Sequence, residues 1–275
     1  MAPTPMGRPP TGPMPTTVAV AIDSSPEALA AARFGARAAE LRGLDLTLCH
    51  AVCPPATTES SAWLLERLQS QVRIPPTMAV TTVLDQLAPA VLLKEMEDHA
   101  ALLVVGRRRS DRPEHSIAGS LAAQLVASVH TPLAVVPAGW TPAPWTSRPV
   151  LVALEMTAGG AAEILAFACE EASRLRAPLV ATHMMAPNDS DDPQRSLRAV
   201  HALLAGWKQD YPDLAFGVDV VVGEPDRAIV EASRRAAALV VGGPRQSQRR
   251  RGWADSIART GVRWAHCPIV VVPRS

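Results

Sequence analysis

Two loops rich in glycine and arginine follow apolar runs and precede stretches with helical spacing. One begins at Gly106 within LVVGRRRSDRPEHSIAGSLAAQLVASVHTPLAVVP (residues 103–137), and the other begins at Gly242 within LVVGGPRQSQRRRGWADSIARTGVRWAHCPIVVVP (residues 239–273). A glycine-rich turn lets backbone N–H groups approach phosphate oxygens, and the positive end of the following helix strengthens the attraction. Each loop is therefore a candidate phosphate-binding site.

The first loop has a structural interpretation beside the functional one. Ser120 stands at a predicted helix start, where its hydroxyl would either bond a phosphate oxygen or cap the helix, a role worth about 1 kcal/mol. Arginines gather at positions 107–109 and 112. They would form either a solvated turn or a set of guanidinium forks that bind phosphate. The sequence alone leaves both pairs of alternatives open.

An acidic residue, Asp23, follows the first apolar run, TVAVAI at 17–22. In an open parallel sheet, ligands bind beyond the carboxyl ends of the strands, at the point where the strand order reverses. Asp23 would accept a hydrogen bond from such a ligand, or it would only end the strand and start a turn. Ser24 or Ser25 can then cap the next helix, in which Pro26 suits the first turn and Gly43 suits the end.

Other chemistries are poorly supported. The cysteines show no CxxC pair, which argues against a zinc site or a disulfide framework, and the histidines at strand ends are given no catalytic role. No GxxxxGK[ST], GxSxG or HExxH motif occurs.

The net charge of +1 gives no overall attraction to nucleic acid or anionic lipid. No apolar run approaches the ~18–20 residues that span a membrane. We expect a cytoplasmic protein with no membrane and no nucleic-acid partner. The cysteines are Cys49, Cys53, Cys169 and Cys267.

The elements that must position these residues alternate between short apolar strands and helical segments. This alternation predicts an α/β fold in which a parallel sheet carries helices on both faces. In the first half, strands are predicted at 17–22, 46–52, 79–84, 101–105 and 133–136, and helices at 26–42, 61–71, 88–99 and 120–129. In the second half, strands are predicted at 150–154, 179–184, 217–222, 238–242 and 268–272, and helices at 160–175, 194–209, 226–235 and 256–264.

The two halves repeat one plan. HTPLAVVP at 130–137 returns as HCPIVVVP 136 positions later, and LVVG at 103–106 returns at the same offset. Self-similarity at domain length indicates a duplicated domain. We expect a disordered proline-rich tail (1–16), a first domain (17–137), a linker (138–148) and a second domain (149–273).

The sequence resembles the universal stress protein family across both halves. The resemblance rests on VAIDSSPEALAAARFGARAAELRG, on the LVVG strands, on the GS pair before a helix and on the HTPLAVV and HCPIVVV endings. It implies two tandem doubly wound domains, each a five-stranded parallel sheet of order 3-2-1-4-5. Family members that bind ATP carry an acidic residue after the first strand and a GxxGx9G[S/T] loop after the fourth.

Neither half carries the whole ATP-binding pattern. In the first half the acidic position is Asp23, and the loop positions fall on Gly106, Arg109, Gly119 and Ser120, so that Arg109 replaces a glycine. In the second half they fall on Glu155, Gly242, Arg245, Asp255 and Ser256, so that a carboxylate stands where phosphate would lie. The resemblance implies a weak ATP site in the first domain and none in the second.

By this resemblance, the first-domain site comprises nine residues: Asp23, Ser24, Ser25, Val52, Gly106, Arg109, Gly119, Ser120 and Leu121. Asp23 would accept from a ribose hydroxyl, as the acidic residue of the family does. The expected role is regulatory, in the stress response, with at most a weak ATPase activity. The alternative is an interaction scaffold whose pockets have decayed. The last strands of the halves are apolar edges, so we expect them to pair and make the chain a pseudo-dimer, with a homodimer left open.

Overall fold

The computed structural model describes residues 14–52, 58–107, 121–142, 148–155, 160–186, 192–244 and 253–274. The N-terminal tail through residue 13, Cys53, and the candidates Arg109, Gly119 and Ser120 lie outside the described residues, as do Arg245 and the side chains of Asp255 and Ser256. The first half contains β1 (Thr17–Ala21), α1 (Pro26–Arg42), β2 (Asp45–Ala51), α2 (Thr58–Gln69), β3 (Val80–Asp85), α3 (Pro89–Glu95), β4 (Ala100–Arg107), α4 (Leu121–Ser128) and β5 (Leu133–Pro137). The second half contains β6 (Val150–Leu154), α5 (Ala161–Leu175), β7 (Leu179–Met185), α6 (Pro193–Asp210), β8 (Phe216–Val222), α7 (Pro225–Ser233), β9 (Ala238–Gly242), α8 (Trp253–Trp264) and β10 (Ile269–Val272).

Each half forms the predicted sheet. The first half has the order β3-β2-β1-β4-β5 and the second the equivalent order β8-β7-β6-β9-β10, with every pairing inside a half parallel. The predicted α/β fold with sheet order 3-2-1-4-5 is thus confirmed. In both halves the first and fourth strands are neighbours, so the strand order reverses between β1 and β4 and again between β6 and β9.

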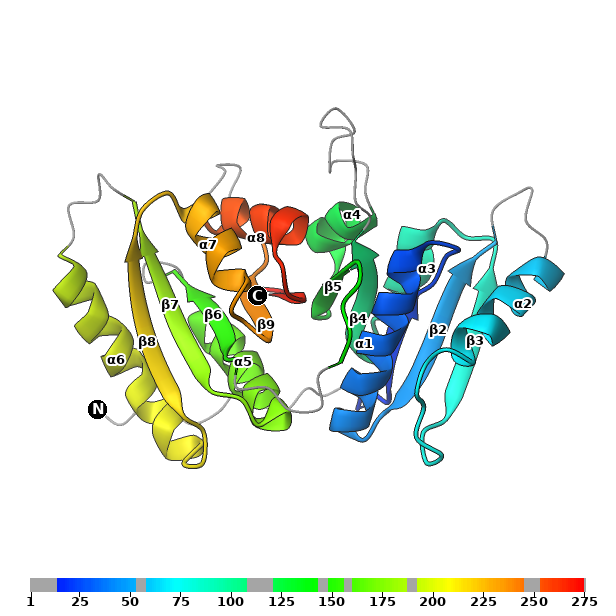
Figure 1. The fold of residues 1–275 in the computed structure, drawn as a ribbon, viewed down its shortest axis with the longest axis horizontal. Coiled ribbons are helices and arrows are strands. Elements are labelled where there is room, and N and C mark those ends of the chain that lie inside the picture. The colour runs from blue at the N-terminus through cyan, green and yellow to red at the C-terminus, as the bar shows by residue number, and fades with distance from the viewer. Residues whose placement is uncertain are drawn as a thin grey trace.

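The two sheets join into one sheet of ten strands through their last strands (Figure 1). β10 lies antiparallel to β5, with Ile269 opposite Val135 and Val271 opposite Leu133. This pairing satisfies backbone groups that would otherwise lie along two apolar edges, and both strands are fully buried. The expected pairing between the last strands is therefore present within one chain.

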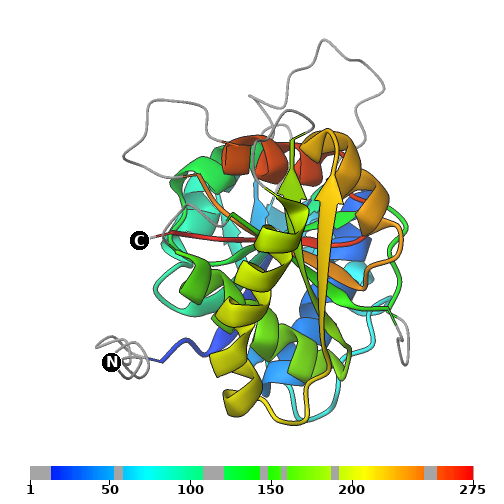
Figure 2. The same cartoon turned by 90° about the vertical axis from the view of Figure 1, so that its left-hand side faces the viewer.

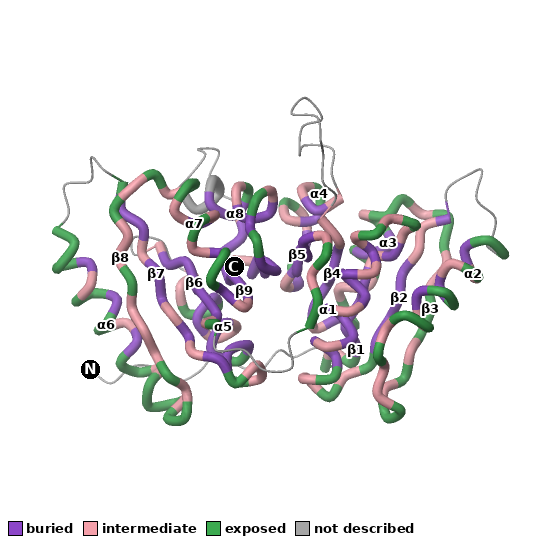
Figure 3. Tube along the Cα trace, viewed as in Figure 1, coloured by how far each residue is buried: buried purple, intermediate pink, exposed green. Residues whose placement is uncertain are grey.

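The helices divide between the two faces of this sheet, as the turned view also shows (Figure 2). Successive strand residues point to opposite faces, so Val104 packs with α1 and α2 while Leu103 and Val105 pack on the other side. On that second face α3 and α4 share one apolar core with α7 and α8 of the other half. The strands at the centre are purple in Figure 3, whereas the edge strands β3 and β8 are largely pink and green. The halves therefore bury a common core.

Helix α1 shows how local sequence sets an element boundary beside the switch point. The Ser25 side chain accepts a hydrogen bond from the N–H of Ala28, and Pro26 opens the helix. Gly43 ends it with φ of 64°, a left-handed conformation that glycine adopts without strain. These caps agree with the sequence prediction and place the N-terminus of α1 directly above the end of β1.

Several helix boundaries differ from the prediction, and the largest differences are in α2, α3 and α8, which begins at Trp253 instead of 256. Helix α3 covers only Pro89–Glu95 instead of 88–99, because a tighter turn in which Met96 N–H bonds Leu93 O leads the chain into β4 at Ala100. Helix α2 begins at Thr58, before the predicted residue 61. At the switch point β1 ends at Ala21 instead of 22, and β4 ends at Arg107 instead of 105.

Candidate functional site

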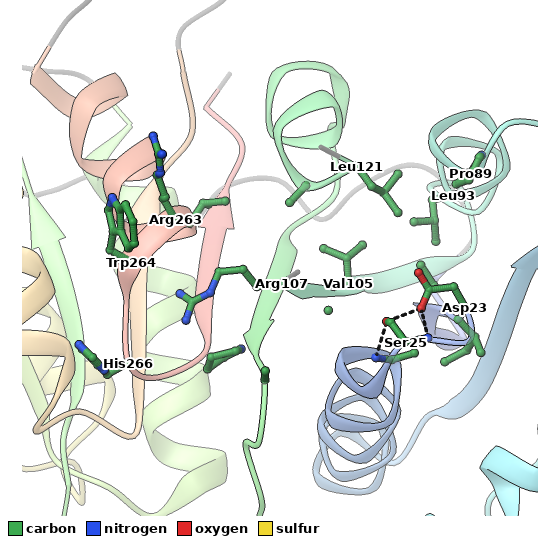
Figure 4. A pocket seen from close by; sticks show the side chains of 18 of the residues that line it. Asp23, Ser25, Pro89, Leu93, Val105, Arg107, Leu121, Arg263, Trp264 and His266 are labelled. Carbon is green, nitrogen blue, oxygen red and sulfur yellow. Dashed lines mark hydrogen bonds between the residues drawn. The ribbon is translucent and has the colours of Figure 1, made fainter. Parts of the chain in front are cut away.

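A cavity of about 1600 Å³ lies beyond the carboxyl ends of β1 and β4 in the first half. Its lining combines polar residues after β1, apolar residues from α3 and α4, and a second wall contributed by α7 and α8 of the other half (Figure 4). Ligand cavities usually measure roughly 300–1,000 Å³. The space therefore suffices for a ligand of nucleotide size.

Asp23 and Ser25 form a fixed polar corner of this cavity. Asp23 Oδ1 accepts a 2.9 Å hydrogen bond from the Ser25 N–H and a short one from the Ser25 hydroxyl. Both residues are partly exposed to the cavity. His50 stabilises the same strand end, since its Nδ1 donates to the Ile22 carbonyl over 2.8 Å. The carboxylate is thereby held in one orientation at the edge of the cavity.

Gly106 follows the buried stretch of β4 and lies against the first turn of α1. A Cβ at this position would stand 2.6 Å from the Glu27 carbonyl oxygen, which is far inside van der Waals contact. Only glycine allows this close approach of strand and helix. The close packing gives Gly106 a structural role at the switch point, and the residue also lines the cavity.

The opposite wall comes from the second half and is tied to β4 by Arg107. The Arg107 guanidinium donates through Nη1 to the carbonyl oxygen of Ala265 over 2.6 Å. That carbonyl lies directly after α8, where helix carbonyls lack partners and cations are favoured. Arg263 lies with its guanidinium carbon 4.8 Å from the centre of the Trp264 ring. In Figure 4, Arg263 and Trp264 lie on the opposite side of the view from Asp23, and the Arg107 side chain extends towards that side.

The second wall is rich in positive charge. Arg227, Arg234 and Arg263 of the second half line the cavity with Asp226 and Glu231 among them, and Arg107 reaches this wall from β4. Glu231 is engaged by the Nε of Arg234 at 3.1 Å. Slight desolvation lowers the pKa of His266, and the positive charges of Arg234 and Arg107 lower it further. A neighbouring histidine therefore senses the positive potential of this wall.

The structure places the predicted site residues unevenly. Asp23, Ser25, Gly106 and Leu121 line the cavity together. Ser24 is exposed and Val52 is buried, with its N–H bonded to Asp85 O, and neither belongs to the cavity lining. The three remaining candidates fall outside the described residues.

Sequence reasoning missed the contribution of the second half. Arg263, Trp264 and His266 lie about 240 positions from Asp23 along the chain. The available signal was the expected pairing of the two last strands. Because β5 and β10 run antiparallel, the end of β4 meets the end of α8, which completes the cavity.

The described cysteines offer no reactive thiol to this site. Burial raises the pKa of Cys49, Cys169 and Cys267 to about 12 in each case. Such thiols stay protonated and behave as packing residues. Within the described ranges, no group of three or more metal-ligating side chains comes together. The described helices include none long and apolar enough to cross a membrane.

Comparison with known sequences gives one consistent result. The sequence profile of the universal stress protein family matches residues 14–137 and again residues 146–273. A universal stress protein of Mycobacterium tuberculosis is 32% identical over 301 residues, which cover 94% of this chain and 96% of the relative. A second one from the same organism is 28% identical over 307 residues, with 92% and 94% covered.

Solved structures agree on the fold at low sequence identity. A universal stress protein from Archaeoglobus fulgidus superposes with a TM-score of 0.68 at 13% identity, covering 95% of this chain and 97% of that one. A structure described as a putative universal stress protein from Pseudomonas aeruginosa gives a TM-score of 0.61 at 14% identity, with 95% and 94% covered. The similarity extends over the tandem arrangement as well as the single domain.

Proposed function

Because this chain belongs to the universal stress protein family, we propose that it is a cytoplasmic stress-response regulator whose first half binds an adenine nucleotide such as ATP, weakly. The observation that carries the proposal is the cavity of about 1600 Å³ that joins Asp23 and Ser25 to a positively charged wall. We assign residues 17–137 and 149–273 to its two domains, with a proline-rich tail (1–16) and a linker (138–148). The pairing of β5 with β10 makes the chain an intramolecular pseudo-dimer.

The chemistry of the cavity matches the parts of a nucleotide. Ala51, Pro89 and Leu121, which line the cavity and are not fully buried, provide apolar surface suited to a base. Asp23 can accept from a ribose hydroxyl, and the guanidinium groups of the opposite wall can bind phosphate oxygens. The ligand would then be held by both halves. A regulatory role fits this arrangement, because a ligand bound in the cavity would contact the interface between the two halves.

A titration of the whole chain with ATP by calorimetry tests the proposal. We expect measurable binding, and Asp23→Ala should weaken it by about tenfold to a hundredfold, because a hydrogen bond to a charged acceptor is worth roughly 1.5–3 kcal/mol. Asp219→Ala, which removes an exposed carboxylate from β8 on the far edge of the sheet, serves as the matched control and should leave the affinity unchanged. No heat of binding at millimolar ATP would reject nucleotide binding.

One observation favours the alternative, a scaffold that binds no nucleotide. Gly106 is already required by its contact with the Glu27 backbone, so its presence does not demand a phosphate. Asp23 likewise has a structural partner in Ser25. If the titration shows no binding, the cavity between the halves becomes the candidate docking site of a protein partner.

A further inference from the structure

The second half carries its own version of the switch point, and Arg274 occupies it. Glu155 follows β6 as Asp23 follows β1, and Gly242 ends β9 at the place that Gly106 has in β4. Arg274 follows β10 and Pro273, as Ala138 follows β5 and Pro137. At the position after this proline, the second half therefore has an arginine where the first half has an alanine.

Arg274 uses that side chain to cover Gly242 and engage Glu155. A Cβ on Gly242 would collide with the guanidinium, whose Cζ would stand only 2.6 Å away. Nη1 of Arg274 donates to Glu155 Oε2 over 3.1 Å. The Arg274 side chain is 4% exposed and that of Glu155 is 23% exposed, so the pair is largely withdrawn from water.

The connection between the acidic residue and the next helix is longer in the second half than in the first. One residue separates Asp23 from the N-cap Ser25 in the first half, whereas four separate Glu155 from the N-cap Gly160 in the second. In the first half the Glu27 backbone lies over Gly106, while in the second half Arg274 lies over Gly242 and also passes beside Gly160. The longer connection is therefore accompanied by a side chain that fills the space.

The arrangement is costly as a purely structural ion pair. Arg274 Nε is buried and has no hydrogen-bond partner among the residues that the structure describes. A buried polar group in that state destabilises the folded protein, and a buried pair gains little over apolar packing. By contrast, Ala138 at the equivalent place in the first half lines an open cavity. The difference between Ala138 and Arg274 is explained if the side chain at this position determines whether a ligand can enter the switch point of that half.

We propose that the second half holds a latent site for an adenine nucleotide, and that Arg274 closes it by covering Gly242 and pairing with Glu155. The guanidinium takes up the carboxylate that a ribose would need. Arg274 thus determines that only one half of the duplicated protein is open. The choice of nucleotide as ligand rests on the function proposed for the first half, whereas the position of the guanidinium does not.

The position of Arg274 is tested without any ligand by a double-mutant cycle. Gly242→Ala should expel the guanidinium and lower the Tm of the whole chain by several degrees, and Arg274→Ala should lower it by a similar amount. Because both changes remove the same contact, the double variant should be no less stable than either single one. Additive losses would show that Arg274 does not lie over Gly242 and would overturn the proposal. Arg198→Ala, which removes an exposed arginine of α6, is the matched control.

The latent site is tested by ATP stoichiometry measured by equilibrium dialysis. Arg274→Ala should bind one more ATP per chain than the unmodified protein, and Arg274→Lys should not, because the ammonium still pairs with Glu155. A count of none rising to one would reject the function proposed for the first half while supporting the latent site. An unchanged count in Arg274→Ala would overturn the latent site and leave the first half unaffected.

Discussion

His266 reports the electrostatic state of the wall that the second half contributes to the cavity. His266 is exposed, yet slight desolvation and the positive charges of Arg234 and Arg107 disfavour its protonated ring, so its pKa lies below the ordinary value of 6.5. Glu231 acts in the opposite direction but does not outweigh them. A negatively charged ligand bound along this wall would favour the protonated ring.

We predict that saturating ATP raises the pKa of His266 relative to the protein alone. The sign follows from the charge, because phosphate oxygens near Arg107 and Arg234 stabilise imidazolium. NMR titration of the histidine ring protons between pH 4.5 and 8 measures both values. His201, an exposed histidine on α6 away from the cavity, serves as the internal reference. If ATP left the pKa of His266 unchanged, the phosphates would not lie beside Arg107 and Arg234.

At the scale of the elements, two glycines inside helices distinguish the effect of close packing from the effect of helix propensity. Gly35 in α1 lies so close to Val20 of β1 that an added Cβ would overlap the Val20 methyl group. Gly206 in α6 is exposed, and an added Cβ would meet no atom within 4 Å. The same substitution therefore has opposite expected effects in the two helices.

Gly35→Ala should lower the free energy of unfolding by about 1–3 kcal/mol, because α1 must move away from the sheet that carries Asp23. Gly206→Ala should raise it by about 0.5–1 kcal/mol, since alanine is the better helix former. Urea denaturation followed by circular dichroism measures both. If Gly35→Ala were as stable as the unmodified protein, the close contact between α1 and β1 would be wrong.

The elements themselves were largely predictable from the sequence. Buried β-branched runs such as TVAVA, and caps such as Ser25 and Gly43, are local signals, and they fixed the strands and α1 nearly to the residue. The ends of α3 were not predictable, because the apolar pattern of 88–99 continues past Glu95 while the turn into β4 is set by tertiary packing. Arg274 was also missed, since nothing local distinguishes a buried arginine at a strand end from a solvated one.

At the scale of the whole molecule, the two halves are linked on both faces of the sheet. On one face α4 and α8 share a core, and on the other Arg42 of α1 forms a buried ion pair with Glu171 of α5. Arg42 also donates to the Ala38 carbonyl over 3.1 Å. Both charged side chains are about 95% buried, at 5% and 4% exposure. The pair fixes how the halves meet.

Glu171→Ala should reduce the free energy of unfolding by about 3–5 kcal/mol, because it leaves the Arg42 guanidinium buried without its counter-charge. The adjacent Glu170→Ala removes an exposed carboxylate from the same helix, and its expected effect is within about 0.5 kcal/mol. Urea denaturation of both variants provides the comparison. Equal effects of the two substitutions would mean that the pair between the halves does not form in solution.

The two strands that pair between the halves, β5 and β10, are synthesised at different times. β5 is synthesised 136 positions before the strand that completes it, an interval of roughly 7–27 s at ~5–20 residues per second. During that interval LAVVP, buried at every residue in the finished protein, is an apolar edge without its neighbour. Another nascent chain presents the same edge, and exchange of β10 between two chains would reproduce the native contacts. Speed of synthesis and spacing of ribosomes on the message therefore bear on whether this protein is made as separate chains or as interlocked pairs.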